Sequence, residues 1–311
     1  MSLRQETIQA ETTTRSASSQ HGLALLLLLA CGSLTAVGFA FGKAAAAAGV
    51  SALPFVFVTA TVAGLVLLAV TIMQGQMPRL GGRYLRYCAI AGLVSYALPN
   101  AIAFMAVPRI GTGLVSIAWA LSPSLTYVLA MALRLDRPRP ARMVGIASAV
   151  AGVAVIVWPG ADGFAGLGPE GIWMVLALAS PLALATGNVY RTVGWPPGIP
   201  GMPLACGMLL AGAIWLLPVA VASGELGRAA QALPQAWPYL AAQSIGASVM
   251  FALYFPLQRI GGPVVLSLIG SVGTVVGLLL GWLLFGEQYA AGVLPGVVLI
   301  LLGVGFVTRR T

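Results

Sequence analysis

Charged residues are scarce in this sequence. Only 7% of its 311 residues are Asp, Glu, Lys or Arg, 59% are hydrophobic, and the mean hydropathy is +0.97. A soluble domain carries roughly a quarter charged residues, so this composition excludes a water-covered globular surface and predicts an integral membrane protein. The apolar runs are about twice as long as the ~10-residue strands of a membrane barrel. They predict an all-α fold, because a helix satisfies its own backbone hydrogen bonds in lipid.

Groups for acid–base, metal or disulfide chemistry are equally scarce. The one histidine, His21, precedes the first apolar run, and no Asp or Glu lies deep inside a run. Cys31, Cys88 and Cys206 lie in separate apolar runs without metal-ligand spacing, and we interpret them as small core residues. We therefore expect no catalytic residue, no metal, no cofactor and no enzymatic activity. An intramembrane enzyme acting on lipid-linked substrates would need clustered acids or histidines.

The basic residues do not indicate a nucleic-acid partner, although the net charge is +9. They stand in ones to fours at the ends of apolar runs, where headgroups and membrane topology use them. The expected partners are thus the lipid bilayer and a small-molecule substrate, with no nucleic acid. Of the 16 cations all but Lys43 are Arg, which favours a GC-rich bacterial genome. The oligomeric state stays open, and a monomer is compatible with the sequence.

Ten apolar runs are long enough to cross a bilayer as helices. Their predicted limits are 22–42, 52–73, 84–107, 112–133, 142–158, 168–191, 201–222, 236–258, 263–286 and 290–308. Residues 1–21, rich in Ser, Thr and Gln, are predicted to be a disordered cytoplasmic tail. With the N-terminus inside, only Lys43, Arg109 and Arg228 among the basic residues fall outside. This positive-inside bias predicts that both termini are cytoplasmic.

One stretch of the chain occurs twice. Phe104-Met-Ala-Val-Pro-Arg-Ile-Gly111 is echoed by Tyr254-Phe-Pro-Leu-Gln-Arg-Ile-Gly261, and each copy precedes a long apolar run that ends in an acid. The runs that follow carry matching glycine pairs, which are Gly145 and Gly152 in the first copy and Gly296 and Gly303 in the second. We infer a first five-helix repeat at 22–158 and a second at 168–308, together one membrane domain. Five is odd, so the second copy enters the membrane from the opposite face, and such inverted repeats are common in secondary transporters.

These motifs resemble the EamA repeat of the drug/metabolite transporter superfamily. The second copy ends its long run in Leu284-Phe-Gly-Glu287, as the family repeat usually does, whereas the first has Leu133-Arg-Leu-Asp136 and keeps only the acid. The resemblance covers residues 22–308. It implies a ten-helix transporter of small metabolites, often an exporter of amino acids or related compounds, in a bacterial inner membrane.

The fourth span carries a tryptophan at an unusual depth. Trp119 lies well inside the span rather than at headgroup level, where Trp is usual, and it shares a helix face with Ser116 and Pro123. A buried Trp needs a partner for its N–H and offers a ring for stacking, while Pro123 can kink the helix. This face is either plain core or the wall of a substrate cavity, and the resembled family places this helix at its central cavity.

Polar side chains also lie inside the third and eighth spans. Tyr96, Pro99 and Asn100 form the most polar mid-span cluster, and Gln243 and Tyr254 share one face of the eighth span. An amide in lipid is costly unless it is hydrogen-bonded, so these side chains face protein or water. They either join helices to one another or bind the polar head of a substrate.

The ninth span combines small and hydroxyl residues. Gly273, Gly277 and Gly281 recur every four residues and permit close approach of another helix. Ser267 and Ser271 lie one turn apart on one face. The span is either a packing helix, with hydroxyls bonded to their own backbone, or a cavity wall at the interface between the repeats.

These candidates predict a neutral, partly aromatic substrate cavity. The predicted wall residues are Trp119, Tyr96, Asn100, Gln243, Tyr254, Ser267, Ser271 and Ser116. Hinge and packing roles are assigned to Pro99, Pro123, Gly273, Gly277 and Gly281. Such a cavity suits an uncharged or zwitterionic, partly apolar solute. A multidrug efflux carrier is the rival function, and a structural subunit would have no solute cavity between its halves.

Ionisable residues near the span ends are expected to be structural. Lys43 and Arg191 each end the first span of their half and are expected to extend to the headgroups, which leaves no Arg or Lys deep in a span. Glu287 is interpreted as structural too. Proton-coupled carriers normally keep an ionisable group along the pathway. We therefore expect facilitated diffusion or exchange by alternating access.

Overall fold

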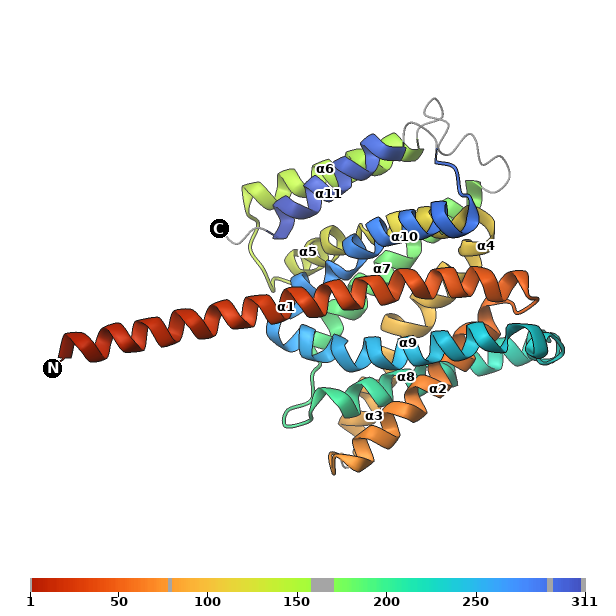
Figure 1. Ribbon diagram of the computed structural model, residues 1–311, viewed down its shortest axis with the longest axis horizontal. Coiled ribbons are helices and arrows are strands. Elements are labelled where there is room, and N and C mark those ends of the chain that lie inside the picture. The colour runs from red at the N-terminus through yellow and green to blue at the C-terminus, as the bar shows by residue number, and fades with distance from the viewer. Residues whose placement is uncertain (1, 78–79, 158–170, 290–292, 309–311) are drawn as a thin grey trace.

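The computed structural model describes residues 2–77, 80–157, 171–289 and 293–308, and no strand occurs in these ranges. The all-α prediction is therefore confirmed for the described residues. The helical elements, shown in Figure 1, are α1 (Ser2–Ala47), α2 (Ala52–Met73), α3 (Gly82–Ala91), η1 (Gly92–Ala97), α4 (Leu98–Trp119), α5 (Ser122–Ala132), α6 (Pro140–Val157), α7 (Gly171–Val193), α8 (Gly201–Ala222), α9 (Glu225–Ser267), α10 (Ile269–Phe285) and α11 (Val293–Thr308). The predicted boundary between the repeats, 158–168, lies outside the described residues.

Seven described helical segments are long and apolar enough to cross a membrane. They are Gly22–Ala47, Ala52–Met73, Gly82–Trp119, Gly171–Val193, Gly201–Ala222, Glu225–Gly262 and Val265–Phe285. Two shorter apolar helices, Pro140–Ile156 and Val293–Phe306, accompany them. Length and composition alone thus give fewer spans than the ten predicted, because adjacent predicted spans are joined and others are short.

A glycine breaks the helix inside one of these segments, Gly82–Trp119, and another glycine ends a second segment, Glu225–Gly262. Gly82–Trp119 and Glu225–Gly262 are 38 residues each, which at 1.5 Å per residue is roughly 57 Å, well beyond the ~30 Å hydrocarbon core. Gly111 has φ 89° and ψ 165°, and Gly262 has φ 70° and ψ −174°. Both need the positive φ that glycine tolerates. The sequence echo aligned Gly111 with Gly261, and the structure places the second break one residue later.

Helix α1 begins before the first predicted span. It is 46 residues long and includes the segment that was predicted as a disordered tail. That segment contains neither Gly nor Pro, so nothing in it ends a helix. In Figure 1 this first part of α1 projects from the bundle, on the side where the last helix, α11, also ends.

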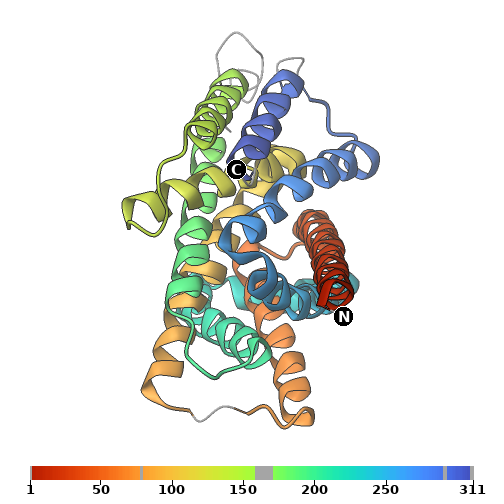
Figure 2. The same ribbon diagram turned by 90° about the vertical axis from the view of Figure 1, so that its left-hand side faces the viewer.

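The helices α6 and α11 pack side by side at one end of the bundle (Figures 1 and 2). Their contact uses the glycines that matched between the copies. A Cβ at Gly152 would lie 2.6 Å from the carbonyl oxygen of Gly296, and a Cβ at Gly303 would overlap the carbonyl oxygen of Gly145. The repeat glycines therefore allow the two backbones to touch.

The rest of the bundle is built from long-range helix pairs. The largest are α2 with α8, α1 with α9, and α4 with α7. Cys31, Cys88 and Cys206 are buried in this core as free thiols, which confirms their interpretation as small core residues. Helices α1, α4, α7, α9 and α10 surround the space in which the candidate site lies.

Candidate functional site

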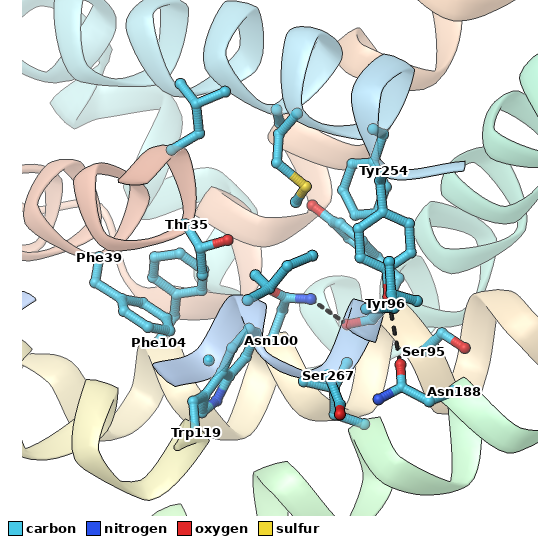
Figure 3. Close-up of a pocket in the computed structure, with 18 of the residues that line it drawn as sticks. Thr35, Phe39, Ser95, Tyr96, Asn100, Phe104, Trp119, Asn188, Tyr254 and Ser267 are labelled. Atoms are coloured by element: carbon cyan, nitrogen blue, oxygen red, sulfur yellow. Dashed lines mark hydrogen bonds between the residues drawn. The ribbon is translucent and has the colours of Figure 1, made fainter. Parts of the chain in front are cut away.

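A cavity of about 60 Å³ lies inside the bundle, between elements from both halves of the chain (Figure 3). Six of the eight predicted wall residues line it, namely Trp119, Tyr96, Asn100, Gln243, Tyr254 and Ser267. No side chain among its lining residues is ionised at neutral pH. Figure 3 shows Trp119, Phe39 and Phe104 toward one end of the cavity and Ser95 and Asn188 toward the other.

Ser116 and Ser271 do not line the cavity, unlike the other six predicted wall residues. The Ser116 hydroxyl donates to the carbonyl of Thr112 at 2.8 Å and lies where a Cβ at Gly277 would be. Thr274 adds a hydrogen bond from its hydroxyl to the Ser116 carbonyl at 2.7 Å. This face of α10 therefore packs against α4, because Gly277 brings the two helices too close to leave space.

In the polar cluster of Tyr96, Pro99 and Asn100, the backbone departs from a regular α-helix because Pro99 lacks one hydrogen bond. Proline has no N–H and its ring crowds the carbonyl four residues earlier, here that of Ser95. The chain adopts a π-helical turn, η1, just before Pro99, and the cavity-lining Tyr96 belongs to it. Asn100 donates its side-chain amide to the Tyr96 carbonyl at 2.8 Å (Figure 3). The Asn100 amide thus bonds within its own helix rather than between helices.

Trp119 is held by one hydrogen bond and one aromatic contact. Its Nε1 donates to Ser180 Oγ at 2.8 Å, and Ser180 Oγ donates to the Pro99 carbonyl at 2.7 Å. Its ring packs edge-to-face against Phe39, with centroids 5.1 Å apart. The helix breaks directly after Trp119, as expected from Pro123, whose ring cannot accommodate the Trp119 carbonyl. That carbonyl instead faces Gly270, where any side chain would collide with it.

Glycines also set the position of Gln243 and of the end of α10. A Cβ at Gly38 would lie 2.9 Å from both polar atoms of the Gln243 amide, so the absence of a side chain there admits the amide to the cavity. A Cβ at Gly273 would lie at an ordinary 3.5 Å from the carbonyl oxygen of Gly32 on α1, whereas a Cβ at Gly281 would overlap the Glu287 carboxylate. The three predicted packing glycines therefore meet three different neighbours.

Arg191 contradicts the expectation that its side chain extends to the headgroups. Its side chain is 0% exposed, although it stands in the last turn of α7. Nη2 donates to Asn188 Oδ1 at 2.7 Å and to the Tyr254 hydroxyl, and the guanidinium lies 4.8 Å from the centre of the Tyr254 ring. Helical side chains point toward the N-terminus of their helix, so Arg191 reaches back to Asn188 rather than out to the headgroups.

Asn188 ties this group to the neighbouring helix. Its side-chain nitrogen donates to Ser122 Oγ at 3.3 Å and to Thr126 Oγ1 at 3.2 Å, and both hydroxyl residues are fully buried on α5. The Tyr254 hydroxyl also donates to Asn188 Oδ1 at 3.4 Å (Figure 3). Asn188 therefore uses both ends of its amide inside the protein.

Lys43 also does not extend to the headgroups. Its Nζ lies 2.5 Å from Glu287 Oε1 and 4.6 Å from the centre of the Phe285 ring. Glu287 further accepts hydrogen bonds from Thr112 N at 2.8 Å, Thr112 Oγ1 at 3.1 Å, Gly113 N at 3.1 Å and the Tyr289 hydroxyl at 2.8 Å. The carboxylate caps the helical segment that begins after Gly111, where free N–H groups favour an anion.

The protonation of Glu287 follows from these contacts. Partial burial by itself would raise the pKa of Glu287, but the donors that surround the carboxylate outweigh this effect, so the pKa lies below its ordinary value. The side chain is therefore a carboxylate at neutral pH. This arrangement favours the structural interpretation of Glu287.

Several lining residues were not predicted. Thr35, Phe39, Ser95 and Phe104 line the cavity, as do further apolar residues of α9 and α10. Sequence signals existed for two of them, because Ser95 precedes the predicted Tyr96 and Phe39 lies between two glycines of the first span. Arg191 was recognised in the sequence but placed at the surface. Its spacing of three from Asn188 would have put both on one helix face.

The fold and the cavity define a multi-pass membrane protein with a neutral internal cavity. Residues 22–158 match the EamA-like transporter family, which confirms the resemblance drawn from the motifs of the chain. Protein PecM of Dickeya dadantii (strain 3937) is 26% identical over 233 residues, 74% of this chain and 75% of PecM. These similarities point to a transporter rather than an enzyme.

A solved crystal structure shares the fold. Its chain is 19% identical in sequence and superposes with a TM-score of 0.60, covering 94% of this chain and 99% of the other. At this identity the likeness describes the architecture alone. It extends over both halves of the chain.

Proposed function

We propose that this protein is a secondary transporter that moves small organic metabolites by alternating access, as a facilitator or exchanger. Amino acids or related compounds are the proposed substrates, and export across a bacterial inner membrane is the proposed direction. The observation that carries the proposal is the central cavity, whose lining is aromatic, amide and hydroxyl in character and comes from both halves of an EamA-like chain.

A ten-helix architecture with two inverted repeats supports this mechanism. Division of Gly82–Trp119 at Gly111 would raise the seven long segments to eight, and the two short apolar helices would bring the total to ten. The helix contacts are compatible with a two-fold relation, because α1 packs on α9 and α10 as α7 packs on α4 and α5. The contact between α6 and α11 has the same relation, because Gly152 faces the carbonyl oxygen of Gly296 and Gly296 faces that of Gly152. In such folds one repeat moves against the other around a central site.

The size of the cavity supports an alternating mechanism. Pockets for organic ligands enclose about 300–1,000 Å³, whereas this one encloses about 60 Å³. Phe104 packs against Phe39 and Phe55, with ring centroids 5.3 and 5.0 Å away, and Phe39 and Phe104 line the cavity. Phe251 and Tyr254, whose rings also pack against each other, line it as well. A solute would therefore require one side to open.

The lining chemistry supports a neutral or zwitterionic, partly apolar solute. Trp119 and the phenylalanines offer stacking surfaces, and Asn100, Gln243 and Ser267 offer amide and hydroxyl groups. No acid among the lining residues could carry a proton or hold a lipophilic cation. This favours an uncoupled metabolite carrier over a multidrug efflux carrier.

Solute flux in proteoliposomes tests the proposal. Vesicles with purified protein would be loaded with a labelled amino-acid mixture, and wild type would be compared with Trp119→Ala and Asn100→Ala. Trp282→Ala is the matched control, because Trp282 is 62% exposed and does not line the cavity. We expect wild type and the control to release particular amino acids, and the two cavity variants to lose at least about tenfold in rate. Absence of amino-acid flux in wild type would refute the substrate class.

A further inference from the structure

Arg191 is a buried cation without an acidic partner. In the described part of the chain no ion pair joins it to a carboxylate, and the hydrogen bonds of its guanidinium go to a neutral amide, a phenol and, weakly, the Met208 sulfur at 3.9 Å. Its Nε is buried and has no acceptor among the described residues. Arg stays protonated in proteins, and a buried charge is costly unless it is paired. The positive charge of this side chain is therefore not neutralised by any carboxylate that the structure describes.

The corresponding cation of the first half does have its partner. Lys43 ends the first span of its half as Arg191 does in the second, and Lys43 is paired with Glu287 at 2.5 Å. The acid that matches Glu287 in the first half is Asp136, which pairs with Arg142 at 2.6 Å. The two halves thus pair these residues differently: Lys43 forms an ion pair with a carboxylate, whereas Arg191, its counterpart, forms none within the described ranges.

Arg191 lies between the central cavity and a second one. Its acceptors Asn188 and Tyr254 line the central cavity. One turn further along the same two helices, Thr192 and Gln258 line a cavity of about 540 Å³ at the end of α7. Gln258 donates to Thr192 Oγ1 at 3.3 Å, so the helices are joined on both sides of the arginine. A solute that moves between the two cavities along α7 and α9 would pass the guanidinium.

We propose that Arg191 binds the carboxylate of the transported solute. The inference rests on the transport function proposed above and narrows its substrates to small organic carboxylates, including amino acids. Nε has no acceptor among the described residues, and Nη1 contacts only the Met208 sulfur. If Nη2 gives up its contact with the Tyr254 hydroxyl, the freed N–H forms a two-donor edge with Nε or with Nη1, and such an edge can hold a carboxylate in two parallel hydrogen bonds. The carboxylate would replace the Tyr254 hydroxyl as a partner of Arg191. Because that contact joins α7 to α9 between the two cavities, its loss would connect the cavities.

A competition series tests the proposal without any variant. Uptake of labelled leucine into proteoliposomes would be inhibited with 4-methylpentanoate, which has the carboxylate but no amine, and with leucinamide and isopentylamine, which lack the carboxylate. We expect 4-methylpentanoate to compete at least about tenfold better than either amine, the discrimination of a charge-assisted bidentate pair. Equal competition by the amines would overturn the assignment.

Two substitutions then test whether this preference for a carboxylate depends on Arg191. R191Q should remove the preference for the carboxylate, and R191K should keep part of it, because Lys retains the charge but not the planar edge. R228Q is the matched control, since Arg228 is exposed and donates to the Ser223 carbonyl at 3.4 Å. A structural role for Arg191 predicts instead a lower melting temperature with unchanged discrimination, and that result would also overturn the proposal.

Direct binding separates this inference from the transport function. In detergent, 4-methylpentanoate should raise the melting temperature of wild type and of R228Q but not that of R191Q. If this shift is present while no amino acid is transported, the proposed function fails and the carboxylate site stands. If leucine is transported and R191Q still prefers carboxylates, the function stands and the site assignment fails.

Discussion

Replacement of Glu287 by glutamine should destabilise the protein through the loss of one ion pair and one helix cap. The carboxylate accepts five hydrogen bonds from four residues, including Lys43 at 2.5 Å, and its side chain is 10% exposed. Glutamine keeps the shape, but its NH₂ group would face donors and Lys43 would lose its partner. Breaking a buried pair from one side costs about 3 kcal/mol. For a chain of this size that lowers the melting temperature by roughly 6 °C.

The matched control is a second carboxylate at a helix start. Glu225 begins α9 and accepts a hydrogen bond from Ser51 Oγ at 2.7 Å, but this contact is exposed. Exposed pairs contribute about 1 kcal/mol or less, so E225Q should shift the melting temperature by no more than about 2 °C. Scanning fluorimetry of the purified proteins in detergent measures both. An E287Q midpoint within about 1 °C of that of E225Q would refute the argument.

The pH dependence supplies an independent check. The pKa of Glu287 is lowered from its ordinary value of 4.5 in the folded protein. Its contribution to stability is therefore fully present above the ordinary pKa and is lost as the pH falls through the folded-state pKa. The gap between wild type and E287Q should stay constant from pH 5 to pH 8 and narrow below about pH 4.5. A gap that closes between pH 6 and pH 8 would contradict the assigned protonation.

Three further outcomes follow from the cavity and its surroundings. Gly270→Ala should lower stability by about 2 kcal/mol and reduce flux, because the new methyl group meets the Trp119 carbonyl. Gly246→Ala is the control, because the nearest atom to its new methyl group is 4.0 Å away. It should change neither the melting temperature nor the flux. Trp119→Phe and Ser180→Ala should each cost about 1 kcal/mol, since either removes the same hydrogen bond, and a double-mutant cycle with additive costs would speak against that bond. Reversal of a pH gradient between pH 6 and pH 8 should leave solute flux unchanged, because Glu287 stays ionised throughout; flux that follows the gradient would exclude an uncoupled carrier.

The candidate site was partly predictable from the sequence. Polar residues inside an apolar run are conspicuous, so Asn100, Gln243 and Trp119 stood out, and the structure brings all three to one cavity. Ser116 and Ser271 were equally conspicuous but lie outside it. Lipid and protein interior are both apolar, so hydrophobic periodicity does not tell which face of a span meets a cavity and which meets another helix.

The sequence by itself determined the class of this protein. Composition excludes a soluble domain, the apolar runs require helices, and glycines at repeat positions mark the break at Gly111 and the contact of α6 with α11. These properties depend on the local chain and on the solvent around it. Only the tertiary structure decided how the charged residues are paired. Lys43 pairs with Glu287, which is 244 residues away in the sequence, whereas Arg191 is buried among neutral groups. Burial and pairing depend on neighbours that are distant in the chain, and a residue's own segment does not encode them.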